Sequence, residues 1–379
     1  MLKIEKIEDL EAFRKLETCW DPLVRQSGNM DIPFMTFNWF SFWWKMFGRG
    51  GRMLILVFSQ DGVPVAILPL MRKLELWRGL PVSTVMFMAN YYSGRTGIIG
   101  RPEATKDLIA PALKYLRDGG FNMLYLNFLS EDSVAEQAFR ELLPASGLGF
   151  RKMLGDVSPY IRIDSTWQDF LKTRSRNLRE KVRRTENSFA RSQKHSLTFV
   201  TAPEDVAAAM DRIVAISRRT WKFREGTAIA NDRAKIEFYR QYGECAAKKG
   251  MLKIAMLEYE GKQIAFTYEI KYGNRDYFLK TGFDEGYARL SPGIFILSES
   301  IKEAFSTGCT EYDLLGQNEG YKMKFTDLVR THYKYWVFND TVYGRFLREW
   351  EFLAAATLRK LLKRMRSACA DLIVKQQGT

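Results

Sequence analysis

The sequence predicts an α+β fold built from two similar halves, each a mixed sheet flanked by helices. The first reason is length, because 379 residues exceed what one hydrophobic core usually organises. The second is composition: 46% apolar and 14% aromatic residues supply enough hydrophobic surface for two cores. This composition argues against disorder over most of the chain. The third is a pattern of hairpin, helix and strand that occurs twice along the chain.

The second copy of this pattern has the clearest elements. Turns at Glu260-Gly261 and Gly273-Asn274 separate three apolar segments, at 252–259, 263–271 and 277–283. This arrangement predicts three antiparallel strands. A helical pattern over 294–305 ends at Gly308, and a short buried strand follows at 312–315.

The start of that helix is suited to an anion. Ser291 can cap the helix, Pro292 fits its first turn, and Gly293 lacks a side chain that would block the free backbone N–H groups. Helix starts of this kind attract phosphates, which makes the pyrophosphate of coenzyme A a suitable ligand.

The first copy repeats these elements but not the phosphate site. Segment 54–58, Asp61-Gly62 and the pair 65–66 match 254–257, Glu260-Gly261 and the pair 264–265, and a helix over 102–120 precedes a strand at 123–128. Any two hairpin-plus-helix units look alike, but the shared order of elements favours duplication. We expect residues 36–150 and 197–338 to form two separate mixed sheets with one strand order. Glu103 stands where the second copy has Gly293 and would repel a phosphate.

Several motifs resemble those of the CelD/BcsL-type acetyltransferases, a GNAT family linked to cellulose and exopolysaccharide biosynthesis. The runs that carry the resemblance are 61–70, 176–184, 260–265, 282–284, 287–293 and 316–322. The family is related to the Fem peptidyltransferases, which carry two GNAT-like halves. The resemblance implies tandem GNAT-like (acyl-CoA N-acyltransferase) domains: a degenerate one over 1–158 and one with the acyl-CoA site over 159–340. Residues 341–379 would form a basic amphipathic C-terminal helix.

The resemblance also implies a function. It predicts an acyl-CoA-dependent N- or O-acyltransferase, using acetyl-CoA and no metal, that acts on a sugar, a sugar nucleotide or an envelope or exopolysaccharide precursor. Two alternatives are Fem-like peptidyl transfer from aminoacyl-tRNA and a non-catalytic accessory role at a polysaccharide synthase. The residues expected to contact the coenzyme are Phe283, Arg289, Leu290, Ser291, Gly293 and Ile294.

Four side chains are candidates for the chemistry. Asp313 ends the strand after the coenzyme helix, so it can be a base or an orienting group, or else a cap or a partner for a nearby lysine. Tyr321 stands where many GNAT enzymes place the tyrosine that protonates the thiolate, although it can equally be a packing residue. Lys322 aligns with a lysine of the Fem-like motif and could stabilise negative charge or contact a phosphate. Glu269 lines the same cleft if strand alternation points it inward.

Aromatic residues suggest two further features. The rings at 34–44 predict a helix packed against the sheet, or alternatively a flat platform for a sugar. Residues Tyr91, Tyr92 and Ser93 are an acceptor-site candidate, because the family's first half commonly keeps polar residues facing the cleft between the halves.

Charge and targeting signals bear on partners and location. The net charge of +14 comes largely from two segments, 172–194 and 345–375. The second is amphipathic and could lie on an anionic membrane or contact a polysaccharide synthase, or simply dock on its own domain. No apolar signal core or membrane-spanning run is present, and the four cysteines form no CxxC pair. We expect a cytoplasmic protein, peripheral at the inner face of the membrane if the second segment binds there. Among nucleic acids only tRNA is a candidate partner.

Overall fold

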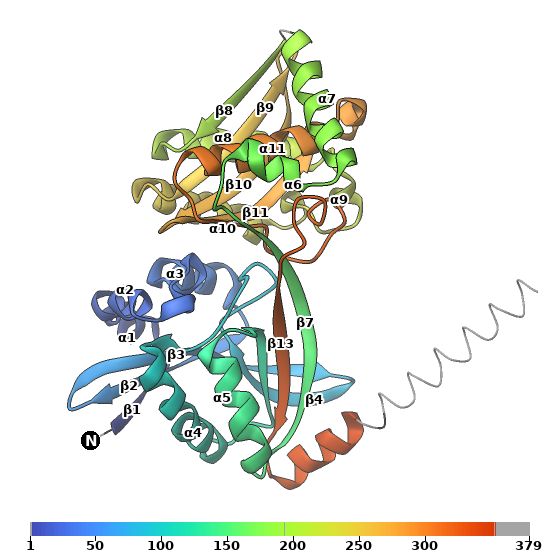
Figure 1. Cartoon of the computed structure of the whole chain (residues 1–379). Helices are drawn as coiled ribbons and strands as arrows, with labels where there is room; N and C mark the ends of the chain where they lie inside the picture. Colours follow the sequence, from blue (N-terminus) through green and yellow to red (C-terminus); the bar gives the residue numbers. More distant parts are fainter. Residues whose placement is uncertain (1, 193, 352, 354–379) are drawn as a thin grey trace, which may run out of the picture.

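The computed structural model describes residues 2–192, 194–351 and 353, and consists of two α/β lobes joined by two long strands (Figure 1). The first lobe contains most of the N-terminal half. Its elements are β1 (Leu2–Ile7), α1 (Leu10–Lys15), α2 (Glu17–Arg25), α3 (Phe37–Phe47), β2 (Gly51–Gln60), β3 (Val63–Trp77), β4 (Leu80–Phe87), β5 (Ile99–Gly100), α4 (Pro102–Asp118), β6 (Met123–Ser130) and α5 (Val134–Leu142).

The second lobe follows the long strand β7 (Gly149–Arg162). Its elements are α6 (Trp167–Thr173), α7 (Arg176–Ser192), β8 (His195–Val200), α8 (Val206–Ser217), α9 (Trp221–Arg224), α10 (Arg233–Lys248), β9 (Leu252–Tyr259), β10 (Lys262–Tyr272), β11 (Arg275–Phe283), α11 (Pro292–Ser306) and β12 (Glu311–Asp313). Strand β13 (Val329–Phe338) then returns to the first lobe, and residues 342–351 begin a further helix. The rest of the predicted C-terminal helix lies outside the described residues.

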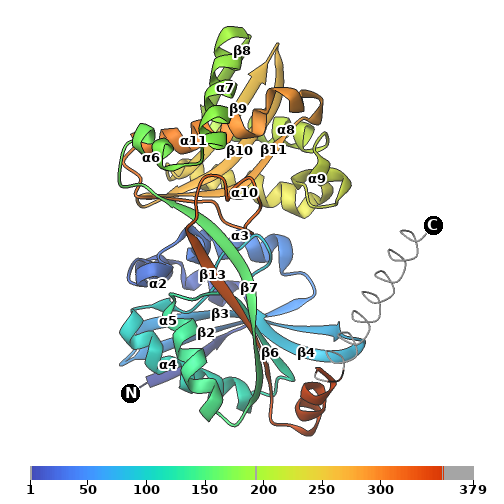
Figure 2. The ribbon, with the colours of Figure 1, turned by 45° about the vertical axis from the view of Figure 1, so that its right-hand side comes forward.

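The strands of the two lobes form one hydrogen-bonded path. Its order is β1-β2-β3-β4-β6-β13-β7-β12-β11-β10-β9-β8, with β5 beside β3. Strand β7 makes the connection, because its residues 149–159 pair with β13 and its residues 160–162 pair with β12. The prediction of two separate sheets is therefore wrong. Figure 2 shows β7 and β13 running side by side from one lobe to the other.

The predicted repeat of strand order is confirmed. Strands β1-β2-β3-β4-β6 and β8-β9-β10-β11-β12 follow the same order, antiparallel at first and parallel in the last pair. An antiparallel strand follows in each lobe, but the two are exchanged: β13 pairs with β6, and β7 pairs with β12. The domain boundary predicted at 158/159 falls inside β7. The repeat also includes β1, α1 and α2, which the range 36–150 omitted.

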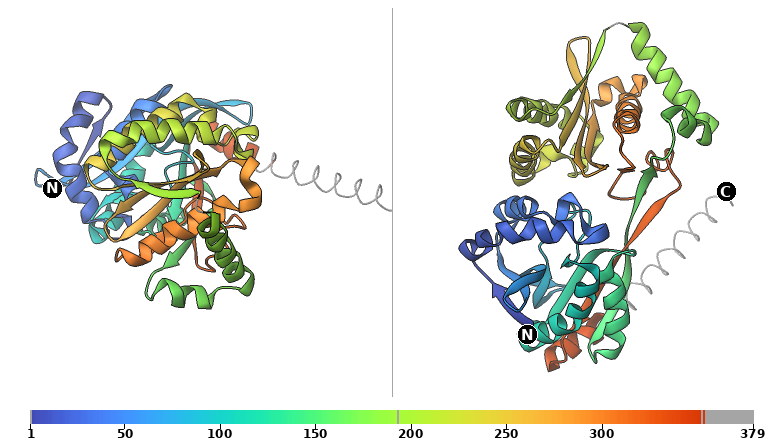
Figure 3. Two further views of the ribbon diagram at one scale, coloured as in Figure 1. Left: turned by 90° about the horizontal axis from the view of Figure 1, so that it is seen from above. Right: turned by 60° about the vertical axis from the view of Figure 1, so that its left-hand side comes forward.

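Helices cover both faces of the sheet in each lobe. In the second lobe, α8 and α10 lie on one face and α11 on the other (Figure 3). Neighbouring residues of β10 face these helices in turn: Tyr268 donates from its hydroxyl to Tyr239 O on α10 at 2.9 Å, whereas Thr267 lies 3.2 Å from Ser300 on α11. This alternation follows from the period of two along a strand, and it decides which side chains reach which face.

The lobes meet through an aromatic core. Trp39 on α3 lies edge-on to Phe238 and Tyr242 of α10, with ring centroids 5.0 and 4.9 Å apart. Phe34 makes a similar contact with Tyr277 of β11 at 5.5 Å. All five rings are buried. The predicted aromatic cluster is thus a packing surface, set against both a helix and a strand of the other lobe.

Candidate functional site

The site begins where two parallel strands separate. Strands β11 and β12 pair over only three positions, 275–277 with 311–313. Beyond them, residues 278–283 of β11 pair with β10 alone among the described strands. The backbone groups on the free side of β11 therefore face an opening rather than a neighbouring strand. This opening divides into two adjoining cavities.

The smaller cavity, of about 250 Å³, lies between the end of β11 and the start of α11. Four of the residues predicted to contact the coenzyme line it: Phe283, Ser291, Gly293 and Ile294. The other two do not. Arg289 is exposed on the short 3-10 helix before α11, and Leu290 packs against a separate apolar cluster.

The start of α11 leaves one backbone donor free. The N–H groups of Ile294 and Phe295 both donate to Ser291 O, at 3.1 and 3.2 Å, whereas the N–H of Gly293 has no acceptor among the described residues. A Cβ at Gly293 would lie 3.0 Å from Phe283 Cδ1, so glycine permits the close approach here. Ser291 adopts a left-handed conformation, with φ of 55°, and its hydroxyl makes no capping bond. The prediction that Ser291 caps the helix is therefore wrong, but the free N–H and the helix dipole still favour an anion.

The larger cavity, of about 360 Å³, lies between the lobes. Tyr91 and Tyr92 line it from the first lobe, and Lys222 and Tyr321 belong to the walls of both cavities. Substrates bound in the two spaces would therefore meet beside Tyr321. Ser93, the third residue of the predicted acceptor segment, is buried, and its hydroxyl accepts a bond from Asn90 N.

Tyr321 is suited to hold a proton. Burial, together with the nearby Glu319, raises the pKa of its phenol above the usual value. The hydroxyl therefore stays protonated at neutral pH, as a general acid requires.

Lys322 also lines the larger cavity, but it is tied to the turn after β12. Its Nζ donates to Leu315 O at 2.7 Å and pairs with Glu319 Oε2 at 2.5 Å. Burial lowers the pKa of this lysine, while Glu319 acts in the opposite direction. Lys322 can thus carry charge at the edge of the cavity while holding the turn that carries Tyr321.

Asp313 lies outside the residues that line either cavity. It is fully buried, paired with Arg95 and with Arg330 Nη1 at 3.1 Å, and it accepts a bond from Leu315 N at 2.9 Å. Burial alone would raise the pKa of this carboxyl, but the two arginines outweigh it and lower the pKa. A carboxylate held by two arginines is a poor proton acceptor, so the geometry favours the structural alternative for Asp313 over a base.

Glu269 does not line the cleft, and the prediction that it does is wrong. Alternation along β10 turns it to the same face as Thr267, toward α11, where it is fully buried and lies 2.9 Å from Lys253 Nζ. Asp276 and Glu303 bind the same amine at 2.5 and 2.7 Å. Burial opposes the charge on Lys253, but the three carboxylates outweigh it and raise its pKa. This cluster stabilises the packing of α11 on the sheet.

Sequence reasoning missed two lysines in the larger cavity, Lys222 on α9 and Lys280 on β11. A signal for Lys280 was available, because it is the one charged residue in the run 277–283 on the strand that faces the opening.

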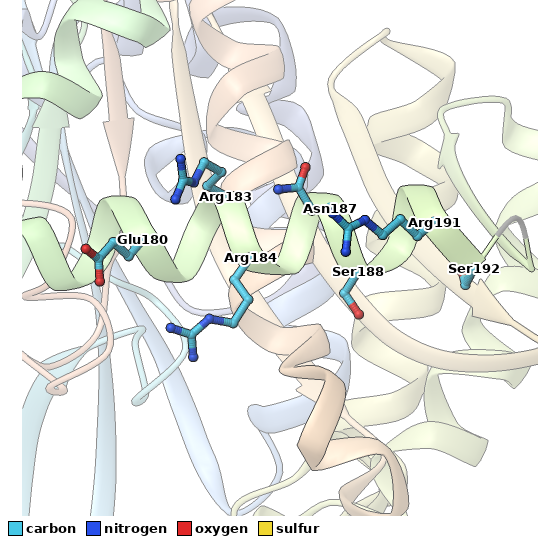
Figure 4. A pocket seen from close by; sticks show the side chains of 7 residues that line it. All are labelled: Glu180, Arg183, Arg184, Asn187, Ser188, Arg191 and Ser192. Atoms are coloured by element: carbon cyan, nitrogen blue, oxygen red, sulfur yellow. The ribbon is translucent and has the colours of Figure 1, made fainter.

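The basic run at 172–194 forms a separate surface. Seven residues of α7 line a shallow polar groove that lies entirely along this helix (Figure 4): Glu180, Arg183, Arg184, Asn187, Ser188, Arg191 and Ser192. The opposite face of α7 buries Leu178, Val182 and Phe189 in the lobe. The helix is thus anchored by its apolar side and presents its arginines outward.

The part of the chain that the structure describes contains no cluster of His, Cys, Asp and Glu fit to hold a metal ion. Within that part, no helix combines the length and apolarity needed to cross a bilayer.

Comparison with known proteins identifies the second lobe. Residues 176–323 match the family described as acetyltransferase (GNAT) domain. FemX is similar over 88% of this chain and 96% of its own, with 13% identity and a TM-score of 0.56. The C-terminal domain of a proposed lysylphosphatidylglycerol synthetase from Agrobacterium fabrum is similar over 90% and 97%, with 14% identity and a TM-score of 0.54. A search of curated proteins returned no match.

These similarities show a GNAT domain in the second lobe and a fold shared with FemX over 88% of the chain. The finer likeness to the CelD/BcsL-type acetyltransferases stays a prediction.

Proposed function

We propose that this protein is an acyl-CoA-dependent acyltransferase. The observation that carries the proposal is the pair of adjoining cavities with Tyr321 in their common wall: one reaches the free N–H of Gly293, and the other opens between the lobes. A donor held at the start of α11 and an acceptor held between the lobes would meet beside a protonated phenol. The match of residues 176–323 to the GNAT acetyltransferase domain supports the same reaction class.

The chain's own residues supply positioning and one proton. Free backbone groups of β11 are available to hold the thioester arm and to stabilise its carbonyl oxygen. An acceptor nitrogen or oxygen bonds to the acyl carbon as the carbon–sulfur bond breaks, and Tyr321 is placed to protonate the departing thiolate. The proton that a neutral amine or alcohol acceptor loses restores the phenol, so with such an acceptor the step releases no net proton.

For the acyl group and the acceptor, we propose acetyl transfer to a sugar, a sugar nucleotide or an amine-bearing envelope precursor. The support is the resemblance of runs such as 287–293 and 316–322 to exopolysaccharide-linked acetyltransferases. Tyr91 and Tyr92 are candidate contacts for that acceptor, since they line the larger cavity.

A second candidate is aminoacyl transfer from a charged tRNA. Two observations favour it: the fold shared with FemX and the outward-facing arginines of α7. Polyanions bind such surfaces in a salt-dependent manner.

Titration calorimetry on the full chain separates the two candidates. We expect saturable binding of acetyl-CoA and of coenzyme A, and thiol release from acetyl-CoA when amine- or hydroxyl-bearing acceptors are added. Binding of aminoacyl-tRNA without any affinity for acetyl-CoA would instead establish the second candidate. A protein that binds coenzyme A but releases no thiol with any acceptor would point to a non-catalytic role.

A further inference from the structure

We propose that the larger cavity binds an anionic group of the acceptor, a phosphate or a carboxylate, with Lys222 and Lys280 as its ligands. The inference deepens the proposed function and rests on it, because it describes the acceptor of the acyl transfer. It narrows the acceptor from any amine or alcohol to one that carries a negative charge.

Lys222 and Lys280, both half-buried, lack the carboxylate partners that the buried Lys253 and Lys322 have. Lys253 is surrounded by three carboxylates, and Lys322 is paired with Glu319. Within the described residues, neither Lys222 nor Lys280 forms an ion pair, and the one hydrogen bond from Lys222 Nζ goes to Thr281 O at 3.4 Å. Both side chains line the larger cavity. The unmatched positive charge is therefore located where a ligand can reach it.

The surroundings of Lys280 compensate its charge only weakly. Its Nζ lies 4.4 Å from the ring centre of Tyr92 and 5.8 Å from that of Tyr239. Lys235 approaches Tyr92 from α10, with its Nζ 5.1 Å from the ring centre and 3.0 Å from Ala228 O. Ring faces attract a cation, but by much less than a buried carboxylate does.

The charges around Lys222 and Lys280 would be better balanced by one bound anion. Burial, followed by the charges of Lys222, Lys235 and Lys322, lowers the pKa of Lys280 to about 7, and Glu319 acts in the opposite direction. Burial and Lys322 also lower the pKa of Lys222, again against Glu319. A bound phosphate or carboxylate would raise the pKa of both amines, since an opposite charge nearby favours the protonated amine. Binding should therefore take up protons near neutral pH.

This site is separate from the one proposed for the coenzyme. Gly293 and Ser291 line only the smaller cavity, whereas Lys280 and Lys322 line only the larger one. Lys222 is the one lysine in the walls of both. A substitution of Lys280 therefore tests the site for an acceptor anion and leaves the site proposed for the pyrophosphate of the coenzyme unchanged.

The test uses inorganic phosphate and acetate as probes. Each is titrated by calorimetry at pH 7 into the full chain saturated with coenzyme A, so that the start of α11 is already occupied. We expect saturable binding, weakened at least 10-fold by Lys280→Met and by Lys222→Met and retained by Lys280→Arg. Lys302→Met is the matched control, because this exposed lysine of α11 is paired with Glu186 and Glu299. Tighter binding of phosphate than of acetate would identify a phosphorylated acceptor, and the reverse a carboxylated one.

A second experiment measures anion binding without the coenzyme, so that its result does not depend on the proposed coenzyme site. In Gly293→Glu without coenzyme A, phosphate or acetate should bind as in the wild type, whether or not the wild type binds acetyl-CoA. Failure of acetyl-CoA to bind would thus contradict the proposed function without deciding the anion site. Absence of binding by both anions, or equal affinity in wild type, Lys222→Met and Lys280→Met, would overturn the inference.

Discussion

Arg95 of the first lobe and Asp313 of the second form a buried ion pair, with 3% and 0% of the two side chains exposed. Arg95 belongs to the segment between β4 and β5, and Asp313 ends β12. In the first lobe this segment also approaches β6, where Thr96 bridges to Leu129. The place that is open in the second lobe, between its parallel strands, is thus occupied by chain in the first. This agrees with a single coenzyme site.

Breaking this pair should destabilise the protein without removing a catalytic base. We expect Asp313→Asn to lower the free energy of unfolding by about 3–5 kcal/mol, because it leaves Arg95 buried without a countercharge. The acidic side of the pH–rate profile should be unchanged. Urea unfolding and turnover measured on the same variant test both points. A flattened acidic limb with normal stability would instead make Asp313 the base.

The effect of Asp313→Asn should depend on pH in one direction. The pKa of Asp313 is lowered in the folded state, so its contribution to stability is complete above the unfolded value of about 3.9 and is lost as the pH falls below it. The difference between variant and wild type should therefore shrink below that pH. The double variant Arg95→Met with Asp313→Asn should lose less stability than the sum of the two single variants.

Gly293→Glu should abolish binding of acyl-CoA. The change places a negative charge beside the free N–H, and its Cβ would contact the ring of Phe283. Glu103→Gly at the start of α4 should leave binding unchanged, because we place no coenzyme site in the first lobe. Calorimetry with acetyl-CoA on both variants is the measurement. An unchanged dissociation constant for Gly293→Glu would place the phosphates elsewhere.

Tyr321→Phe should slow turnover by roughly 10²- to 10⁴-fold while leaving affinity for the coenzyme nearly intact, because it removes only the proton donor. Tyr343→Phe is the matched control: this hydroxyl donates to Pro81 O and lies outside both cavities, so turnover should stay close to wild type. Steady-state kinetics and calorimetry on both variants provide the comparison. Normal turnover in Tyr321→Phe would rule out the phenol as the acid.

Lys280→Met should stabilise the unliganded protein, most strongly at low pH. A lysine with a pKa of about 7 in the folded state and about 10.4 when unfolded destabilises the fold fully below pH 7, and this cost fades as the pH rises toward 10.4. We expect an increase in Tm of several degrees at pH 6, since a gain of 1 kcal/mol corresponds to about 2–4 °C in domains of roughly 150–250 residues. The increase should be smaller at pH 9.5. Melting curves of Lys280→Met and of the control Lys302→Met are the measurement. Equal changes of Tm in the two variants would contradict the prediction.

Local patterns in the sequence were sufficient for the elements of the second lobe. The turns at Gly261 and Gly273 and the start of α11 at Pro292 stand where the sequence predicts them, because turn residues and strand periodicity act within a few positions. The predicted phosphate site also lies beside a cavity.

Long-range relationships could not be derived in the same way. Nothing near Asp313 in the sequence indicates Arg95 as its partner, 218 positions away. Whether the side chain of Glu269 points toward the cleft or toward α11 depends on which helix covers each side of β10. The position of Lys280 in a cavity depends on Tyr92 from the other lobe.

The exchange of β7 and β13 bears on synthesis at the ribosome. Strand β6 has β4 on one side, but its other partner, β13, comes about 200 residues later, as in the pairing of Ser130 with His332. During synthesis, one edge of β6 would therefore stay unpaired until β13 has been made. Such an edge is prone to pair with a strand of another chain. Neither lobe is a unit that can be cut out, and fragments ending near residue 158 should aggregate.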